Sequence, residues 1–259
     1  MIKILCLKPR KFTYFCIMEW FESWFDTPYY HILYKNHDYQ EAESFISKLV
    51  TELGTPRGAK IIDLACGKGR HSVYLNNLGF NVLGLDLSKK SIDFNKQFED
   101  VDLHFEVHDM RDPIQSEKVD AVFNLFTSFG YFDSEEDDKK VFQSVAEVLP
   151  ENGVFVLDYL NENYVRENLV PEETVTRGDI QFFIHKKIEN NFIVKDIQFE
   201  ANGQKHHYFE RVKLHTPEQI NAYAEEFGFE RIKVWGDYQL GDFIPSESPR
   251  CINWFRKRH

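Results

Sequence analysis

The stretch from Ile61 to His71, with the sequence IIDLACGKGRH, constrains the fold of this chain more than any other feature. An apolar run too short for a helix leads into a Gly-x-Gly turn, and an amphipathic segment follows. This pattern predicts a buried strand followed by a helix. Gly67 and Gly69 lack Cβ atoms where a ligand must approach backbone N–H groups at the electropositive amino end of that helix. The stretch therefore predicts a binding site for a nucleotide-like ligand.

The residues around the turn narrow the choice of ligand. A dinucleotide-binding fingerprint has a third glycine where this chain has Ser72, which disfavours a nicotinamide cofactor. Asp63 precedes the glycines, at a point where a carboxylate suits the amino group of a ligand better than a pyrophosphate. The next predicted strand, 81–86, ends in Asp86, which is placed to accept hydrogen bonds from both hydroxyls of a ribose.

Three motifs follow one another along the chain: DLACGKGRH at 63–71, GLDLS at 84–88 and HDM at 108–110. In this order and spacing they resemble the cofactor motifs of class I S-adenosylmethionine-dependent methyltransferases, and the resemblance runs from about residue 29 to 159. It implies an α/β fold with a Rossmann-like seven-stranded sheet, helices on both faces and S-adenosyl-L-methionine (SAM) as the cofactor. The cofactor-binding residues that we expect in these motifs are Asp63, Gly67, Gly69, Asp86, Leu87, Asp109 and Met110.

Aromatic residues crowd the segment before the first strand. Packing against the sheet explains most of them. Tyr30 and Tyr34, however, resemble a Tyr-x-x-x-Tyr segment that folds over the cofactor in small-molecule methyltransferases. We therefore expect Tyr34 at the cofactor and Tyr30 beside the substrate.

The fourth predicted strand, near 119–124, runs into a loop that ends at Phe132. Ligands of open parallel sheets bind outside the carboxyl ends of the strands, so this loop should face the reactive methyl group. The chain has Asn-Leu-Phe-Thr where methyltransferases that act on bases or glutamine often carry Asn/Asp-Pro-Pro-Tyr. The segment FTSFGY resembles the corresponding segment of enzymes that methylate small metabolites, including amino-sugar N-methyltransferases. We expect Asn124 and Phe126 at the cofactor, and Phe129 and Tyr131 at the substrate.

The sequence pattern changes in the second half of the chain. Three strand-like segments at 174–188, 191–200 and 205–213 predict an antiparallel β meander inserted at about 173–214. The resemblance to small-molecule methyltransferases implies that this insertion covers the substrate pocket or builds a dimer contact. His206 and His207 should point to opposite faces of their strand, so we expect no metal site. A helix should begin after Thr216, and 231–235 and 251–255 should close the sheet as a hairpin. Asp158 would contact substrate or cap a turn.

Length and composition fit one domain. The chain has 259 residues, of which we assign 18–259 to the methyltransferase domain and 1–17 to a loose tail or a start-site artefact. No apolar run is long enough to cross a bilayer, and no secretory signal is recognisable. A net charge of −11 disfavours nucleic acid. Four cysteines without C-x-x-C spacing suit a reduced cytoplasm, and the protein should be a monomer or a homodimer.

The predicted function is methyl transfer from SAM to a small molecule. An amine that enters neutral needs little acid–base machinery, so the absence of a placed His/Asp pair favours an amine acceptor, and no catalytic residue is nominated. Two alternatives remain open at this point: a catalytically silent protein that binds SAM or S-adenosylhomocysteine (SAH) and acts by interaction, and an NAD(P)-dependent oxidoreductase.

Overall fold

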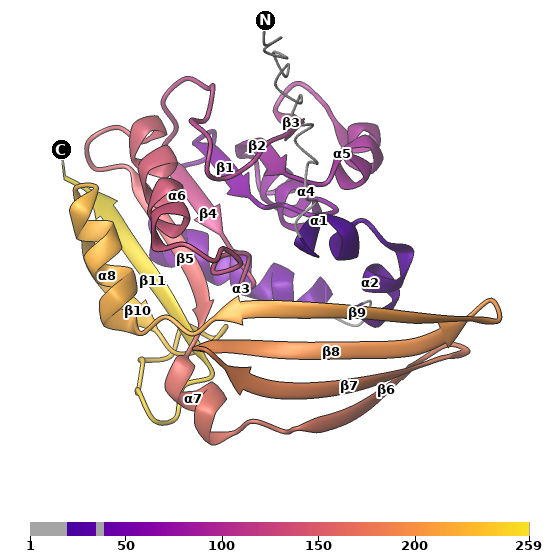
Figure 1. Cartoon of the computed structure of the whole chain (residues 1–259). Coiled ribbons are helices and arrows are strands. Elements are labelled where there is room, and N and C mark those ends of the chain that lie inside the picture. Colours follow the sequence, from indigo (N-terminus) through magenta and orange to yellow (C-terminus); the bar gives the residue numbers. More distant parts are fainter. Residues whose placement is uncertain (1–19, 35–38, 259) are drawn as a thin grey trace, which may run out of the picture.

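The main sheet has seven strands in the order β10-β11-β5-β4-β1-β2-β3 (Figure 1). The computed structural model describes residues 20–34 and 39–258, so the predicted tail at 1–17 lies outside the described residues. Neighbouring strands are parallel from β5 to β3, and β11 is antiparallel to both β5 and β10. The strands are β1 (Lys60–Leu64), β2 (Asn81–Asp86), β3 (Leu103–Val107), β4 (Ala121–Asn124), β5 (Val154–Leu160), β10 (Phe229–Trp235) and β11 (Arg250–Lys257).

Helices cover both faces of this sheet. On one face, α3 (Tyr39–Glu52), α4 (Arg70–Asn77) and α5 (Lys89–Asn95) enclose an apolar core, and a 3-10 turn at Lys96–Phe98 extends α5. On the other face, α6 (Glu135–Val148) and α8 (Pro217–Glu226) enclose a second core. Side chains of Ser88, Ser134 and Thr216 cap the amino ends of α5, α6 and α8 by accepting backbone N–H groups, and the helix start after Thr216 is as predicted.

A second, four-stranded antiparallel sheet is inserted between β5 and α8, after the short helix α7 (Glu162–Glu167). Its strands are β6 (Glu172–Arg177), β7 (Ile180–Glu189), β8 (Phe192–Ala201) and β9 (Gln204–Lys213). The expectation of three strands is wrong, because the segment 174–188 bends at Gly178, whose φ of 58° is accessible to glycine without strain. The Rossmann-like α/β fold with an inserted antiparallel meander is confirmed.

The inserted sheet packs against the first two helices, α1 (Trp20–Phe25) and α2 (Pro28–Leu33), which lie beside β9 in Figure 1. Trp24 stacks on Tyr208 at a ring distance of 4.6 Å, and Phe182 and Ile197 are fully buried beneath them. These contacts place α1 and α2 between the inserted sheet and the carboxyl ends of the main strands.

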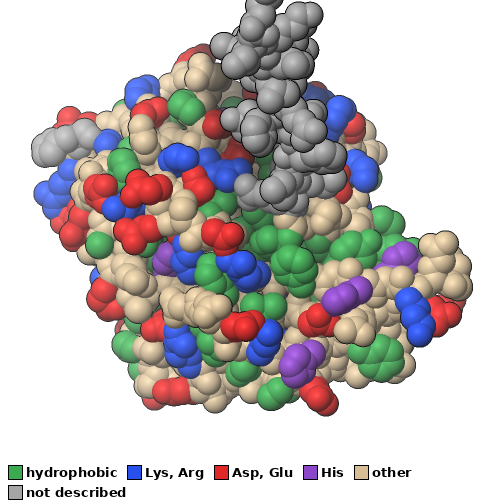
Figure 2. Space-filling model, viewed as in Figure 1, with side chains coloured by type: hydrophobic (Ala, Val, Ile, Leu, Met, Phe, Trp, Pro, Cys, Tyr) green, Lys and Arg blue, Asp and Glu red, His purple; other side chains and the backbone are tan. Residues whose placement is uncertain are grey.

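The surface mixes charges of both signs. On the face drawn in Figure 2, Lys and Arg side chains are interspersed with Asp and Glu, and histidines gather over the inserted sheet. His206 stacks on Phe199 while His207 hydrogen-bonds Asp196, so the two histidines face opposite sides of β9 as predicted. Within the described part of the chain, every helix is too short or too polar to cross a membrane.

Candidate active site

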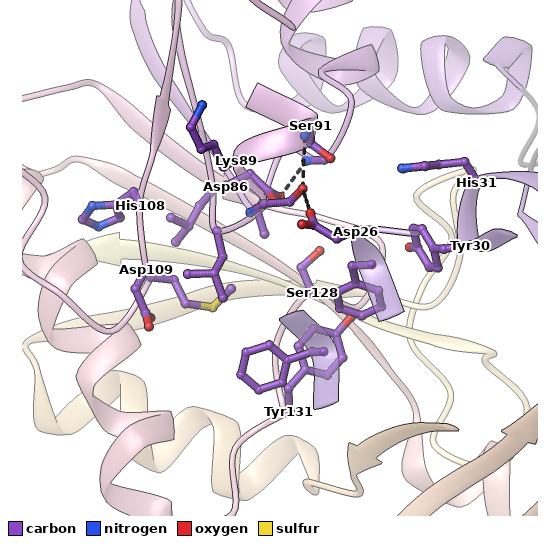
Figure 3. A pocket seen from close by; sticks show the side chains of 18 of the residues that line it. Asp26, Tyr30, His31, Asp86, Lys89, Ser91, His108, Asp109, Ser128 and Tyr131 are labelled. Atoms are coloured by element: carbon purple, nitrogen blue, oxygen red, sulfur yellow. Dashed lines mark hydrogen bonds between the residues drawn. The ribbon is translucent and has the colours of Figure 1, made fainter. Parts of the chain in front are cut away.

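A cavity of about 290 Å³ opens at the carboxyl ends of β1, β2 and β3, and residues of α1 and α2 line its other side (Figure 3). Seven of the predicted site residues line it, and they come from five separate segments of the chain. Figure 3 shows His108 and Asp109 on one side of the cavity and His31 and Tyr30 on the other. The predicted residues that line it are Tyr30, Gly67, Asp86, Leu87, Asp109, Met110 and Tyr131.

Asp86, the last residue of β2, organises the floor of the cavity. Its Oδ2 accepts a hydrogen bond from the Gly67 N–H at 2.8 Å, and its Oδ1 accepts one from the Ser88 N–H at 2.8 Å. Burial raises the pKa of this carboxyl, and the two backbone N–H groups oppose that rise. Each carboxylate oxygen has a further lone pair, so the group can still accept two ligand hydroxyls.

The turn between β1 and α4 has a left-handed backbone at three positions. Gly67 and Gly69 have φ of 54° and 73°, and Ala65 beside them has φ of 64°. A Cβ at Gly67 would meet no atom within 4 Å, whereas a Cβ at Gly69 would lie 2.9 Å from the Phe105 ring. Gly67 therefore leaves open space on the cavity side, while Gly69 lets the start of α4 pack closely on β3.

Asp109 follows the end of β3 at one side of the cavity. Arg111 donates to it from Nε and from Nη2, the latter at 2.6 Å. Although burial opposes ionisation, these hydrogen bonds and the charge of Arg111 hold the pKa of Asp109 below its usual value. The carboxylate is thus an ionised acceptor beside Met110, next to the apolar side of the cavity.

Asp63 lies beside the cavity rather than in its wall. It is 1% exposed and accepts a hydrogen bond from the Ser72 hydroxyl at 2.6 Å. Burial raises the pKa of this carboxyl to about 6. Ser72, which replaces the third glycine of a dinucleotide site, therefore contacts the carboxylate that precedes the turn.

An aromatic wall closes the cavity opposite the strands. Phe21, Phe25, Tyr30 and Tyr131 line it, and the ring of Tyr131 lies 5.4 Å from that of Phe25. Burial raises the pKa of both tyrosines above the usual value, so their hydroxyls stay protonated.

Tyr34, expected at the cofactor, instead joins a buried ion pair in the inserted sheet. Its hydroxyl donates to Glu210 at 2.7 Å, Trp24 Nε1 donates to the same carboxylate at 2.8 Å, and Lys195 lies 3.0 Å away. Although burial opposes ionisation, the charge of Lys195 and these hydrogen bonds hold the pKa of Glu210 below its usual value. This cluster fastens α1 and α2 to β8 and β9.

Three further predicted residues lie outside the cavity wall. Asn124 is buried and donates from Nδ2 to the Leu64 carbonyl at 3.0 Å, which ties β4 to β1. Phe126 stacks on His71 at 4.8 Å. Phe129, expected beside the substrate, is 0% exposed and packs in the core, because the loop after β4 turns its ring toward α6.

Seven polar residues that line the cavity were missed by the sequence reasoning: Asp26, His31, Ser88, Lys89, Ser91, His108 and Ser128. The Ser88 hydroxyl donates to Asp26 and so joins the α1–α2 turn to the end of β2. Burial, followed by the positive charge of Lys68, lowers the pKa of His31 to about 4. Proximity to Tyr30 in the sequence was the one available signal for His31.

Comparison with known proteins identifies the family. A family model described as a methyltransferase domain matches residues 56–210, which include the glycine turn, Asp86 and Asp109. The chain belongs to this methyltransferase family. The predicted resemblance is thereby confirmed.

Two relatives of this methyltransferase are named as N-methyltransferases. A glycine/sarcosine N-methyltransferase of Aphanothece halophytica is 28% identical over 77% of this chain and 75% of its own length. A dTDP-3-amino-3,4,6-trideoxy-alpha-D-glucopyranose N,N-dimethyltransferase of Streptomyces venezuelae is 33% identical over 48% of this chain and 52% of its own length. An S-adenosylmethionine-dependent methyltransferase structure from Clostridium acetobutylicum has a TM-score of 0.76 and 18% identity, covering 89% of this chain and 96% of that one.

Proposed function

We propose that this methyltransferase transfers a methyl group from SAM to the nitrogen of a small-molecule amine. The observation that carries the proposal is the single cavity in which Asp86, Asp109 and the open backbone at Gly67 meet an aromatic wall. Two carboxylates at successive strand ends suit the hydroxyls and the amine of an adenosine, and the space beside Gly67 suits the amino-acid part of the cofactor.

The residues present fit SAM, which supplies an electrophilic methyl group on a sulfonium when it is bound. Asp86 would hold the ribose and Asp109 the adenine amine, with Leu87 and Met110 as apolar neighbours. The rings of Tyr30 and Tyr131 favour a positively charged ligand and exclude water from it. The main task of these residues is to bind and orient the two reactants.

His31, Tyr30 and Tyr131, on the aromatic side of the cavity, are poor general bases, and on that side this favours an amine over a hydroxyl acceptor. The lowered pKa leaves His31 unprotonated but weakly basic at neutral pH, and the raised pKa values of Tyr30 and Tyr131 exclude phenolate there. A hydroxyl acceptor commonly needs a general base of pKa near the operating pH. A neutral amine already has its lone pair free and needs none. The two N-methyltransferases named above support the same acceptor class.

The test is methyl transfer from labelled SAM to a panel of glycine, sarcosine and a dTDP-amino sugar, with the corresponding hydroxyl compounds as controls. We expect label on nitrogen and none on oxygen. Label on oxygen would refute the amine proposal, and SAH binding without any turnover would support the silent binder. Calorimetry with SAH and with NAD distinguishes the methyltransferase from the oxidoreductase.

We also propose a cytoplasmic location. Among the described residues, Cys66 and Cys251 are free, buried thiols, which suits a reducing compartment. Cell fractionation tests the location, and light scattering distinguishes a monomer from a homodimer.

A further inference from the structure

The loop that follows β4 has a backbone that most residues avoid. Phe126 and Thr127 are consecutive and have φ of 59° and 60°. Thr127 is β-branched, which makes a positive φ a genuine outlier. Such conformations persist only where the surrounding structure holds them in place.

Asp158, near the carboxyl end of β5, holds both residues. Its Oδ2 accepts the Phe126 N–H at 2.7 Å, and its backbone carbonyl accepts the Thr127 N–H at 3.2 Å. The side chain of Asp158 is 0% exposed, so these hydrogen bonds form away from solvent. Two successive amides of the unusual backbone are therefore attached to one residue of the neighbouring strand.

Arg250, the first residue of β11, orients the Asp158 carboxylate. It donates to Oδ1 from Nε at 2.8 Å and from Nη2 at 2.7 Å, and Nη2 also donates to Thr127 Oγ1 at 2.7 Å. The guanidinium thus contacts both the residue that holds the loop and the loop itself. Asp158 and Arg250 form a pair that we call the clamp.

The held loop supplies part of the cavity wall. The Thr127 carbonyl accepts the Tyr131 hydroxyl at 2.6 Å, and the next residue, Ser128, lines the cavity with Tyr131. The direction of the Thr127 peptide therefore sets where Tyr131 lies against Phe25. A change of φ at Thr127 would move that carbonyl and release the ring.

We propose that Asp158 and Arg250 are positioning residues for methyl transfer. By holding Phe126 and Thr127 at positive φ, the clamp places Ser128 and Tyr131 to align the acceptor, without contacting the cofactor-binding carboxylates. The inference rests on the proposed function for its kinetic consequence, but its structural part does not.

The first test is amide hydrogen exchange of peptides spanning residues 124–132, measured by mass spectrometry. In Arg250→Met we expect exchange in this segment to rise about tenfold or more, because hydrogen bonds to a charged group are among the stronger ones. SAH affinity should stay within about threefold of wild type, because Asp86 and the glycine turn are untouched. Arg256→Met, on the same strand, is the matched control and should change neither quantity.

Exchange in Arg250→Met equal to that of wild type would overturn the clamp. Should Arg250→Met not fold, Arg250→Lys carries the same expectation, since lysine keeps the charge and loses the two-pronged contact. This test needs no acceptor. If no amine in the panel is methylated, the proposed function fails while the exchange result still decides the clamp.

The second test uses the amine that is methylated best. Arg250→Met should lower kcat by roughly ten- to a hundredfold, because misplacement of reacting groups by about 1 Å has effects of that size, and the KM for SAM should change by less than kcat does. Adding Thr127→Gly should restore much of kcat, since glycine adopts positive φ without strain. A double variant no faster than Arg250→Met, or a loss confined to the KM for SAM, would contradict the assignment.

Discussion

Alanine substitutions at Gly67 and Gly69 should affect protein stability and cofactor binding to different extents. Both have positive φ, so alanine at either position costs about 1–2 kcal/mol from the left-handed backbone. At Gly67 nothing else is added, because its Cβ would meet no atom within 4 Å. At Gly69 the Cβ would lie 2.9 Å from Phe105 and 3.1 Å from Asn95, and overpacking of a core adds about 1–3 kcal/mol.

We therefore expect Gly67→Ala to lose about 1–2 kcal/mol of unfolding free energy and Gly69→Ala about 2–5 kcal/mol, measured by denaturant titration. The loss of SAH affinity should follow the opposite order, with the larger loss in Gly67→Ala. Gly67 lines the cavity, so its new methyl group should weaken SAH binding by about tenfold or more in calorimetry. If Gly67→Ala were the less stable variant, or bound SAH like wild type, the assignment of open space to Gly67 would be refuted.

Three further predictions concern single side chains. Asp86→Asn should weaken SAH binding by roughly 10- to 100-fold in calorimetry, because hydrogen bonds to a carboxylate are lost, whereas the exposed Asp93→Asn should not. The pKa of His31 is about 4 in the folded protein and 6.5 in the unfolded chain, so His31 contributes stability above pH 6.5 that is lost as the pH falls toward 4. His31→Gln should flatten that part of a profile of unfolding free energy against pH. Glu210→Gln should lower the free energy of unfolding by about 1–3 kcal/mol in denaturant titration, because it leaves a partly buried lysine unpaired. The exposed Glu226→Gln should lower it by less than about 1 kcal/mol, and equal losses would contradict the role given to Glu210.

Features encoded locally could be predicted from the sequence. The glycine turn, the acidic residue that ends β2 and the cap at Thr216 each depend on a few consecutive residues, and the structure has all three. Strand ends of a parallel sheet meet at one edge, which is why Asp86 and Asp109 could be brought together without coordinates.

Contacts between distant segments could not be predicted. Arg250 meets Asp158 across 92 residues, and Tyr34 meets Glu210 across 176 residues. No periodicity or motif marks such partners. Phe129 shows a second limit, because the side to which a ring turns in a loop depends on backbone angles that apolar patterning does not encode.

The attachment of α1 and α2 to the inserted sheet has a consequence for how the protein is made. Residues of α1 and α2 line one side of the cavity, and Glu210, which holds these helices to the inserted sheet, is among the last fifth of the chain to leave the ribosome. Contacts so remote in sequence form slowly, because a long loop must close before they stabilise anything. The nascent chain should accordingly complete its parallel strands well before it can enclose a ligand.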